Sequence, residues 1–154
     1  MEILKSIFNF NDYSRFLIIT LGNAFRGDDG VGEFIAERLK SVPANVRVID
    51  AGINPENIMD EAVNFLPEKT VVIDASDFNG KPGEVRIIPE ENINETSLST
   101  HTFPIRIITE LLKHDTGSEV VFLGIQAKNM PFIRGLSPDV ENAAVEIIHF
   151  INKS

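Results

Sequence analysis

Runs of apolar residues alternate along the chain with segments whose apolar residues recur every three or four positions. The runs are rich in β-branched residues and predict five strands, over 15–21, 46–50, 70–75, 85–88 and 119–125. The periodic segments predict helices over 2–8, from 30 to near Pro43, and over 56–65, 104–114 and 137–152. Because strands and helices alternate, the pattern predicts an α/β layered domain with a mostly parallel sheet. The strand over 85–88 follows a short Pro-Gly turn and is a candidate for an antiparallel neighbour.

The same pattern predicts the domain organisation. Residues 1–15 form an N-terminal extension, in which Ile3, Leu4, Ile7 and Phe8 have the spacing of a short helix that packs against the body. Residues 16–154 form one domain without repeats or an internal boundary, which suits the length of 154 residues.

Composition narrows the classes of protein to consider. The formal net charge of −9, with 14 scattered Lys and Arg residues, argues against a nucleic-acid partner. No apolar run approaches the length of about 20 residues that spans a bilayer, and the first residues do not resemble a signal peptide. The chain has no cysteine, which excludes disulfides, thiolate ligands and a thiol nucleophile. We therefore expect a cytoplasmic protein that is not inserted in a membrane.

The first strand is followed by a glycine-rich turn, GNAFRGDDGVG over 22–32, that carries Asp28 and Asp29. A third acid, Asp74, ends the strand over 70–75. The turn lacks the dinucleotide fingerprint and the P-loop lysine, and its carboxylates would repel a phosphate. A local explanation is available for each acid, since an aspartate can cap a helix or form a turn. However, the carboxyl ends of parallel strands meet at one edge of the sheet, where three acids together would require a cation or a shared proton.

His101 lies in a polar loop before a predicted helix. A loop histidine is most simply a structural or solvated residue, but two carboxylates and one imidazole also make a metal site with open coordination positions. Three phenylalanines in predicted loops, Phe25, Phe103 and Phe132, can grip a substrate or pack in the core. Arg26 and Lys128 can steer an acidic partner or belong to the solvated surface.

Several blocks of sequence, in order and at suitable spacing, resemble the hydrogenase maturation endopeptidases. They are LGNAFRGDDGVG, DAGINPEN, VVIDASD, PGEVRIIPEENI, STHTFPI and VFLGIQ, within residues 16 to 152. The combination is most similar to the branch that processes formate-hydrogenlyase-type hydrogenases (hydrogenase 3). The resemblance implies a twisted sheet between two helix layers, a three-layer α/β/α fold, and residues 1–15 precede the usual start of these proteins.

The resemblance also implies a reaction, the hydrolysis of one peptide bond that releases the C-terminal extension of a [NiFe]-hydrogenase large-subunit precursor after nickel insertion. Three metal-contacting positions of the family correspond here to Asp29, Asp74 and His101. The nickel is carried by the substrate, and other divalent ions can replace it in the isolated protein. Asp28 would cap or orient the loop. The resemblance further suggests a monomer.

Two interpretations that assign the chain to other classes of protein remain. A phosphoacceptor receiver domain would use Asp28, Asp29, Asp74 and Lys128, but its acidic pair directly follows a strand, whereas these acids come seven and eight residues after Leu21. A receiver also has no role for His101. A non-catalytic nickel-dependent maturation chaperone would use the same three ligands as the peptidase without cutting the precursor.

Overall fold

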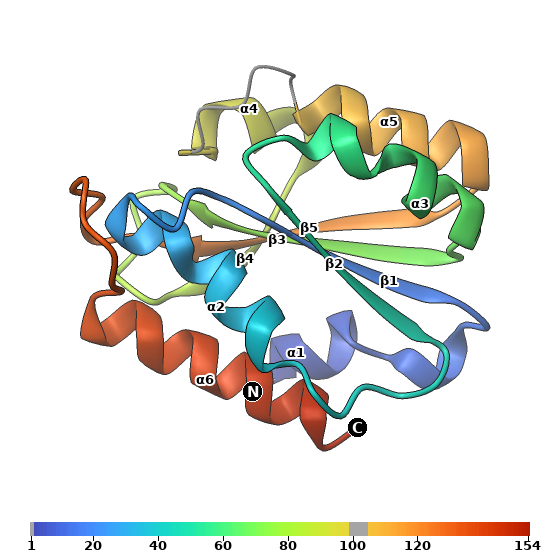
Figure 1. The fold of residues 1–154 in the computed structure, drawn as a ribbon, viewed down its shortest axis with the longest axis horizontal. Coiled ribbons are helices and arrows are strands. Elements are labelled where there is room, and N and C mark those ends of the chain that lie inside the picture. Colours follow the sequence, from blue (N-terminus) through green and yellow to red (C-terminus); the bar gives the residue numbers. More distant parts are fainter. Residues whose placement is uncertain (1, 99–104) are drawn as a thin grey trace.

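The computed structural model describes residues 2–98 and 105–154, which form a five-stranded sheet with helices on both faces (Figure 1). The strands are β1 (Phe16–Leu21), β2 (Val46–Gly52), β3 (Lys69–Ser76), β4 (Val85–Ile88) and β5 (Glu119–Gln126), in the order β2-β1-β3-β5-β4. Four strands are parallel, and β4 pairs antiparallel with β5 at the edge. The predicted α/β fold is thus confirmed, as is the antiparallel strand.

The helices divide between the two faces of the sheet. Three helices, α1 (Glu2–Ile7), α2 (Val31–Arg38) and α6 (Pro138–Asn152), cover one face. The other face is covered by α3 (Met59–Phe65), α4 (Ile93–Thr96) and α5 (Ile105–Thr116). No helix in the described ranges is both long enough and apolar enough to cross a membrane.

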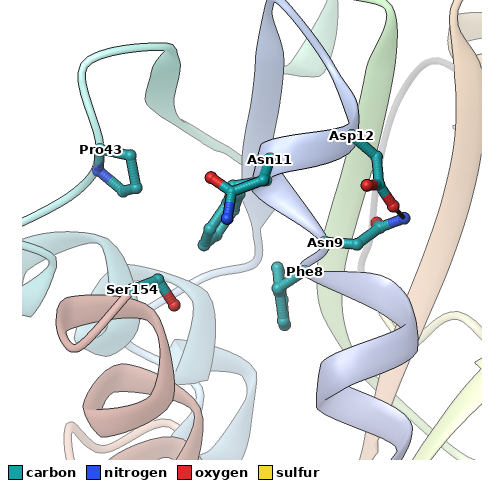
Figure 2. Close-up of a pocket in the computed structure, with 7 residues that line it drawn as sticks. Phe8, Asn9, Asn11, Asp12, Pro43 and Ser154 are labelled. Atoms are coloured by element: carbon teal, nitrogen blue, oxygen red, sulfur yellow. Dashed lines mark hydrogen bonds between the residues drawn. The ribbon is translucent and has the colours of Figure 1, made fainter.

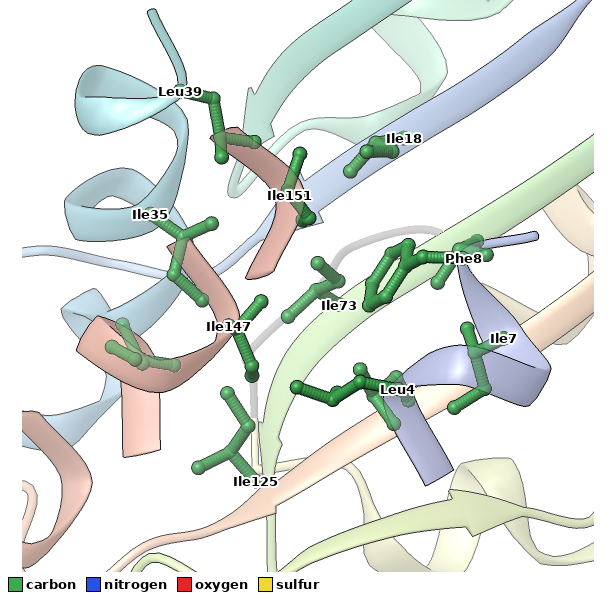
Figure 3. Close-up of a cluster of buried hydrophobic side chains, with 14 of the residues drawn as sticks. Leu4, Ile7, Phe8, Ile18, Ile35, Leu39, Ile73, Ile125, Ile147 and Ile151 are labelled. Atoms are coloured by element: carbon green, nitrogen blue, oxygen red, sulfur yellow. The ribbon is translucent and has the colours of Figure 1, made fainter. Parts of the chain in front are cut away.

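Each face of the sheet buries its own apolar cluster. On the first face, Ile18, Ile73 and Ile125 of the strands contact side chains of α1, α2 and α6 (Figure 3). Leu4 and Ile7 of α1, followed by Phe8, are buried in this same cluster. The rings of Phe10 and Phe16 meet edge to face, with their centroids 4.7 Å apart. The N-terminal segment therefore supplies part of the core that supports β1 and β3.

Short helical turns are the elements that the apolar pattern does not predict. The polar stretch after β4 forms a 3-10 turn, η4 (Glu90–Asn92), and then α4, which buries only Ile93 on the sheet. The helix expected over 56–65 begins as a 3-10 turn, η3 (Pro55–Ile58). The glycine-rich turn contains a further one, η2 (Gly27–Gly30), directly before α2.

Candidate functional site

The strand order places the glycine-rich turn and Asp74 on either side of a topological switch point. The chain leaves β1 for β2 on one side and reaches β3 on the other side of β1. The paired residues of β1 and β3 end with Thr20 beside Ile73. The carboxyl end of β1 therefore lies next to Asp74 of β3. In open α/β sheets this position is where ligands bind, since the connections on its two sides diverge.

Asp29 lies in η2 and is fully buried. Its carboxylate accepts a hydrogen bond from the backbone nitrogen of Asn23 at 2.9 Å. Gly22, with φ of +127°, passes so close that an added methyl group would overlap the carbonyl oxygen of Asp29 and lie 3.1 Å from its Oδ1. A glycine at position 22 therefore lets the turn bring the Asp29 carboxylate back against the end of β1.

Asp74 is also fully buried, within the last residues of β3. Its Oδ1 accepts the backbone N–H of Ala75 at 2.9 Å, and Ser97 Oγ lies 3.4 Å from its Oδ2. Ser97 also forms an isolated antiparallel bridge with Ser76. The chain after α4 therefore returns to the carboxyl end of β3, beside Asp74.

The structure brings two of the three predicted metal-contacting residues to the same edge of the sheet. Asp29 and Asp74 both lie there, since η2 contacts β3. His101, like Phe103, lies outside the described residues. Within ranges 2–98 and 105–154, no group of three His, Asp or Glu side chains could hold a metal ion. His101 as the third ligand therefore stays a prediction.

Asp28 has a different role from its neighbour. Its buried carboxylate accepts hydrogen bonds from the backbone nitrogens of Lys128 (2.8 Å) and Asn129 (2.9 Å). Two more come from the backbone nitrogen (2.7 Å) and hydroxyl (2.9 Å) of Ser137. Asp28 therefore orients a loop, as expected, but the loop is the one that follows β5, and its side chain does not cap α2.

Gln126, at the end of β5, is a positioning residue that the sequence does not reveal. Its Oε1 accepts the backbone N–H groups of Phe78 (2.9 Å) and Gly80 (3.1 Å), and its Nε2 lies 3.2 Å from Asp77 Oδ1. The side chain thus fixes the turn that follows Asp74. From the sequence, only the position of Gln126 at the end of a predicted strand points to this role, because its hydrogen-bond partners in the turn are distant in sequence.

A pocket of about 320 Å³ lies away from this site (Figure 2). It is lined by residues that precede β1, among them Asn9 and Asp12, and by Pro43, which precedes β2. These residues mark the amino ends of the strands, whereas the acids lie at the carboxyl ends. The pocket is therefore separate from the candidate site.

Comparisons with known proteins agree with the fold. The family model HycI, hydrogenase maturation protease, matches residues 31–154. Hydrogenase 3 maturation protease of Escherichia coli K12 is 36% identical over 135 residues, which cover 86% of this chain and 85% of that protein. The crystal structure of the [NiFe] hydrogenase maturation protease HycI from Thermococcus kodakarensis KOD1 has a TM-score of 0.85 at 31% identity. It covers 98% of this chain, and this chain covers 97% of it, so the likeness reaches into residues 1–15.

These matches decide among the readings that the sequence leaves open. The receiver reading is wrong, because the family model covers most of the chain and because all four hydrogen bonds described for Asp28 come from the loop after β5. The relatives are named as proteases, which favours a peptidase over a non-catalytic chaperone. The chain belongs to the hydrogenase maturation protease family and is a peptidase.

Proposed function

We propose that this peptidase removes the C-terminal extension of a [NiFe]-hydrogenase large-subunit precursor after nickel has been inserted. In this proposal Asp29, Asp74 and His101 contact the nickel that the precursor carries. The observation that supports it most is that Asp29 and Asp74, two buried carboxylates from different segments, lie at the same edge of the sheet, at its switch point.

Burial explains why a cation suits this position. Taking a carboxylate out of water is unfavourable unless hydrogen bonds or a positive charge compensate for the lost hydration. Asp29 and Asp74 are both at 0% exposure, and a divalent ion placed between them would offset the repulsion between two negative charges. Two carboxylates and an imidazole are donors that nickel and other divalent first-row ions accept.

The nickel ion belongs to the substrate in this account. The three side chains supply only part of a coordination shell, and the precursor supplies the rest. We therefore expect the isolated protein to bind divalent ions weakly and to bind the nickel-loaded precursor more tightly than the nickel-free one.

Two chemical schemes fit these residue types. The metal can polarise the scissile carbonyl and activate water, or the carboxylates can act as general base and acid while the metal serves only in recognition. Measuring binding and cleavage on the same variants separates them. In the first scheme, an Asp→Asn variant fails to cleave because it no longer contacts the metal. In the second, a variant that still binds nickel-loaded precursor fails to cut it.

Intact-mass spectrometry of a candidate precursor tests the function directly. The precursor is prepared with and without inserted nickel, incubated with this protein, and compared with an incubation that lacks the protein. We expect a single shortened product from the nickel-loaded form and none from the nickel-free form. Binding without shortening would contradict a peptidase role for this substrate, and equal cleavage of both forms would contradict nickel recognition.

We further propose that the protein acts in the cytoplasm and as a monomer. The absence of cysteine is compatible with a reducing compartment. Light scattering coupled to size-exclusion chromatography should give a mass near the 17.1 kDa of one chain, and cell fractionation tests the compartment.

A further inference from the structure

Asn23, the second residue of the glycine-rich turn, has four polar groups, and the turn uses three of them. Its backbone nitrogen donates to Oδ2 of Asp29 at 2.9 Å. Its carbonyl oxygen accepts the backbone N–H of Arg26 at 3.0 Å, and its side-chain Oδ1 accepts that of Phe25 at 2.9 Å. The fourth group is the side-chain amide nitrogen, Nδ2, which carries two N–H donors.

The Nδ2 group is not used by the folded chain. Within residues 2–98 and 105–154, no atom accepts a hydrogen bond from it. Asn23 is half-buried, and Nδ2 is not one of the buried side-chain atoms that lack a partner in these ranges. The amide nitrogen is therefore accessible from solvent and has both donors available for a bound molecule.

The turn holds this amide in a fixed orientation. A side-chain oxygen that accepts the N–H two residues ahead makes an Asx turn, and the bond from Arg26 to the Asn23 carbonyl closes a β-turn over the same residues. The bond from Phe25 also identifies which side-chain atom is oxygen and which is nitrogen. Because Oδ1 is held, Nδ2 is held with it, and a donor that is already oriented stabilises charge without reorganising.

The same residue lies directly beside the candidate site. The Asn23 backbone nitrogen contacts the Asp29 carboxylate, and the preceding residue, Gly22, donates its own N–H to the carbonyl of Gly52 at 2.9 Å. Asn23 is thus fixed at the carboxyl end of β1, where Asp29 and Asp74 share an edge of the sheet. A peptide bond that is cut at this edge would lie within the surroundings of Asn23.

Turn formation by itself does not select asparagine at position 23. Aspartate and serine also accept the N–H two residues ahead. An aspartate would add a further negative charge to a turn that already carries Asp28 and Asp29. A serine would keep the turn neutral but would not supply an amide nitrogen. Asparagine is the residue that combines the turn acceptor with an uncharged N–H donor.

We infer that Asn23 Nδ2 donates a hydrogen bond to the carbonyl oxygen of the scissile peptide bond in the precursor. The inference rests on the proposed function, because it takes the precursor as the substrate. In the reaction, the oxygen of a water molecule bonds to the carbonyl carbon, a base of the site takes a proton from this water, and the π electron pair moves to the carbonyl oxygen. Asn23 binds that oxygen more strongly once it is negative, which lowers the barrier. The C–N bond then breaks, and the departing nitrogen takes the proton.

The test uses Asn23→Ser and Asn23→Ala with nickel-loaded precursor. The serine oxygen can still accept the N–H of Phe25, whereas alanine provides neither the acceptor nor the donor. The matched control is Asn142→Ser, at an exposed asparagine of α6. Biolayer interferometry gives Kd without requiring cleavage, intact-mass time courses give kcat and KM, and thermal unfolding reports the fold of each variant.

We expect Asn23→Ser to fold and bind precursor like wild type and to lose about 100-fold or more in kcat, as enzymes do when one such donor is removed. Asn23→Ala should lose as much in kcat and also unfold at a lower temperature, and the control should match wild type.

A serine variant with nearly wild-type kcat would overturn the inference, because the turn acceptor alone would then suffice. A raised Kd at unchanged kcat, or a serine variant that fails to fold, would overturn it too. Wild type that binds the precursor and never cuts it would instead reject the proposed function, so the two failures are distinguishable.

Discussion

Ser137 donates two hydrogen bonds to Asp28, one from its backbone nitrogen at 2.7 Å and one from its hydroxyl at 2.9 Å. This contact joins the turn after β1 to the end of the loop after β5, just before α6 begins at Pro138. It explains one of the two acids of the glycine-rich turn. Asp28 holds the loop after β5 against this turn, whereas the Asp29 carboxylate accepts the backbone N–H of Asn23 within the turn.

Replacing Asp28 with Ala should destabilise the protein by about 3 kcal/mol, because buried donors lose a charged acceptor. Urea denaturation measures the change in the free energy of unfolding. Hydrogen exchange should also quicken at Lys128, Asn129 and Ser137, whose N–H groups bond to the carboxylate. The control is Asp115→Ala on an exposed side chain. Equal stability of the two variants would show that Asp28 does not hold the loop.

Gly22→Ala should disturb the site more than it disturbs the fold. An added methyl group would overlap the carbonyl oxygen of Asp29, so the turn must move and carry the carboxylate with it. We expect loss of precursor cleavage in a protein that still folds. Gly117→Ala is the matched control, since Gly117 also has a positive φ (+71°) but open space around it. That variant should lose only about 1 kcal/mol of stability, from strain, and should cleave normally.

Phe8→Ala tests the structural importance of the segment before β1. The side chain is 3% exposed and contacts the aromatic rings of Phe10, Phe16 and Phe150. Its truncation should cost about 3–5 kcal/mol, through lost burial and the cavity left behind. Phe132→Ala, at an exposed position, should change stability by less than about 0.5 kcal/mol. A Phe8 variant as stable as wild type would mean that the segment is dispensable for folding.

Lys69 gives a prediction of pH dependence. Its ammonium is almost fully buried, donates to Asn9 Oδ1 at 2.7 Å and lies 3.5 Å from Glu119 Oε2. Burial lowers the pKa of Lys69 below its ordinary value, although the negative charges of Glu119 and Asp12 oppose the shift. Below about pH 10.4, the unfolded lysine keeps its proton while the folded one begins to lose it. Stability contributed by this group therefore rises with pH in that window.

The measurement compares wild type with Lys69→Met from about pH 7 to about pH 9.5, below the ordinary pKa of tyrosine near 10. This range avoids deprotonation of Tyr13, whose pKa burial raises further, helped by Glu119. Wild type should gain stability relative to the variant as pH rises. The control substitution is Lys113→Met, at an exposed lysine paired with Glu90. A relative loss of wild-type stability with pH would contradict a lowered pKa.

The fold is predictable from the sequence where burial makes a continuous pattern. β1 and β3 are buried along their whole length, so their apolar runs fix them to within one or two residues. In contrast, α4 buries only Ile93, and so short a helix leaves no period to detect. Short 3-10 turns such as η3 likewise depend on local hydrogen bonds more than on apolar spacing.

The candidate site is predictable only in part. Its acids are all aspartates, and they differ only in what surrounds them in the folded protein. Adjacent Asp28 and Asp29 look alike in sequence, yet one bonds to a loop about a hundred positions away. The sequence places Asp29 in the turn that follows one strand and Asp74 near the end of another, which predicts their common edge. That two side-chain donors of Arg26 lack a partner within the described residues is likewise visible only in the structure.

The central claim is that Asp29, Asp74 and His101 together engage the nickel of the precursor. Intact-mass spectrometry of nickel-loaded precursor, incubated with Asp29→Asn, Asp74→Asn and His101→Ala variants of confirmed fold, tests it most directly. We expect each variant to leave the precursor at full length under conditions in which wild type shortens all of it. Complete processing by all three variants would contradict the claim.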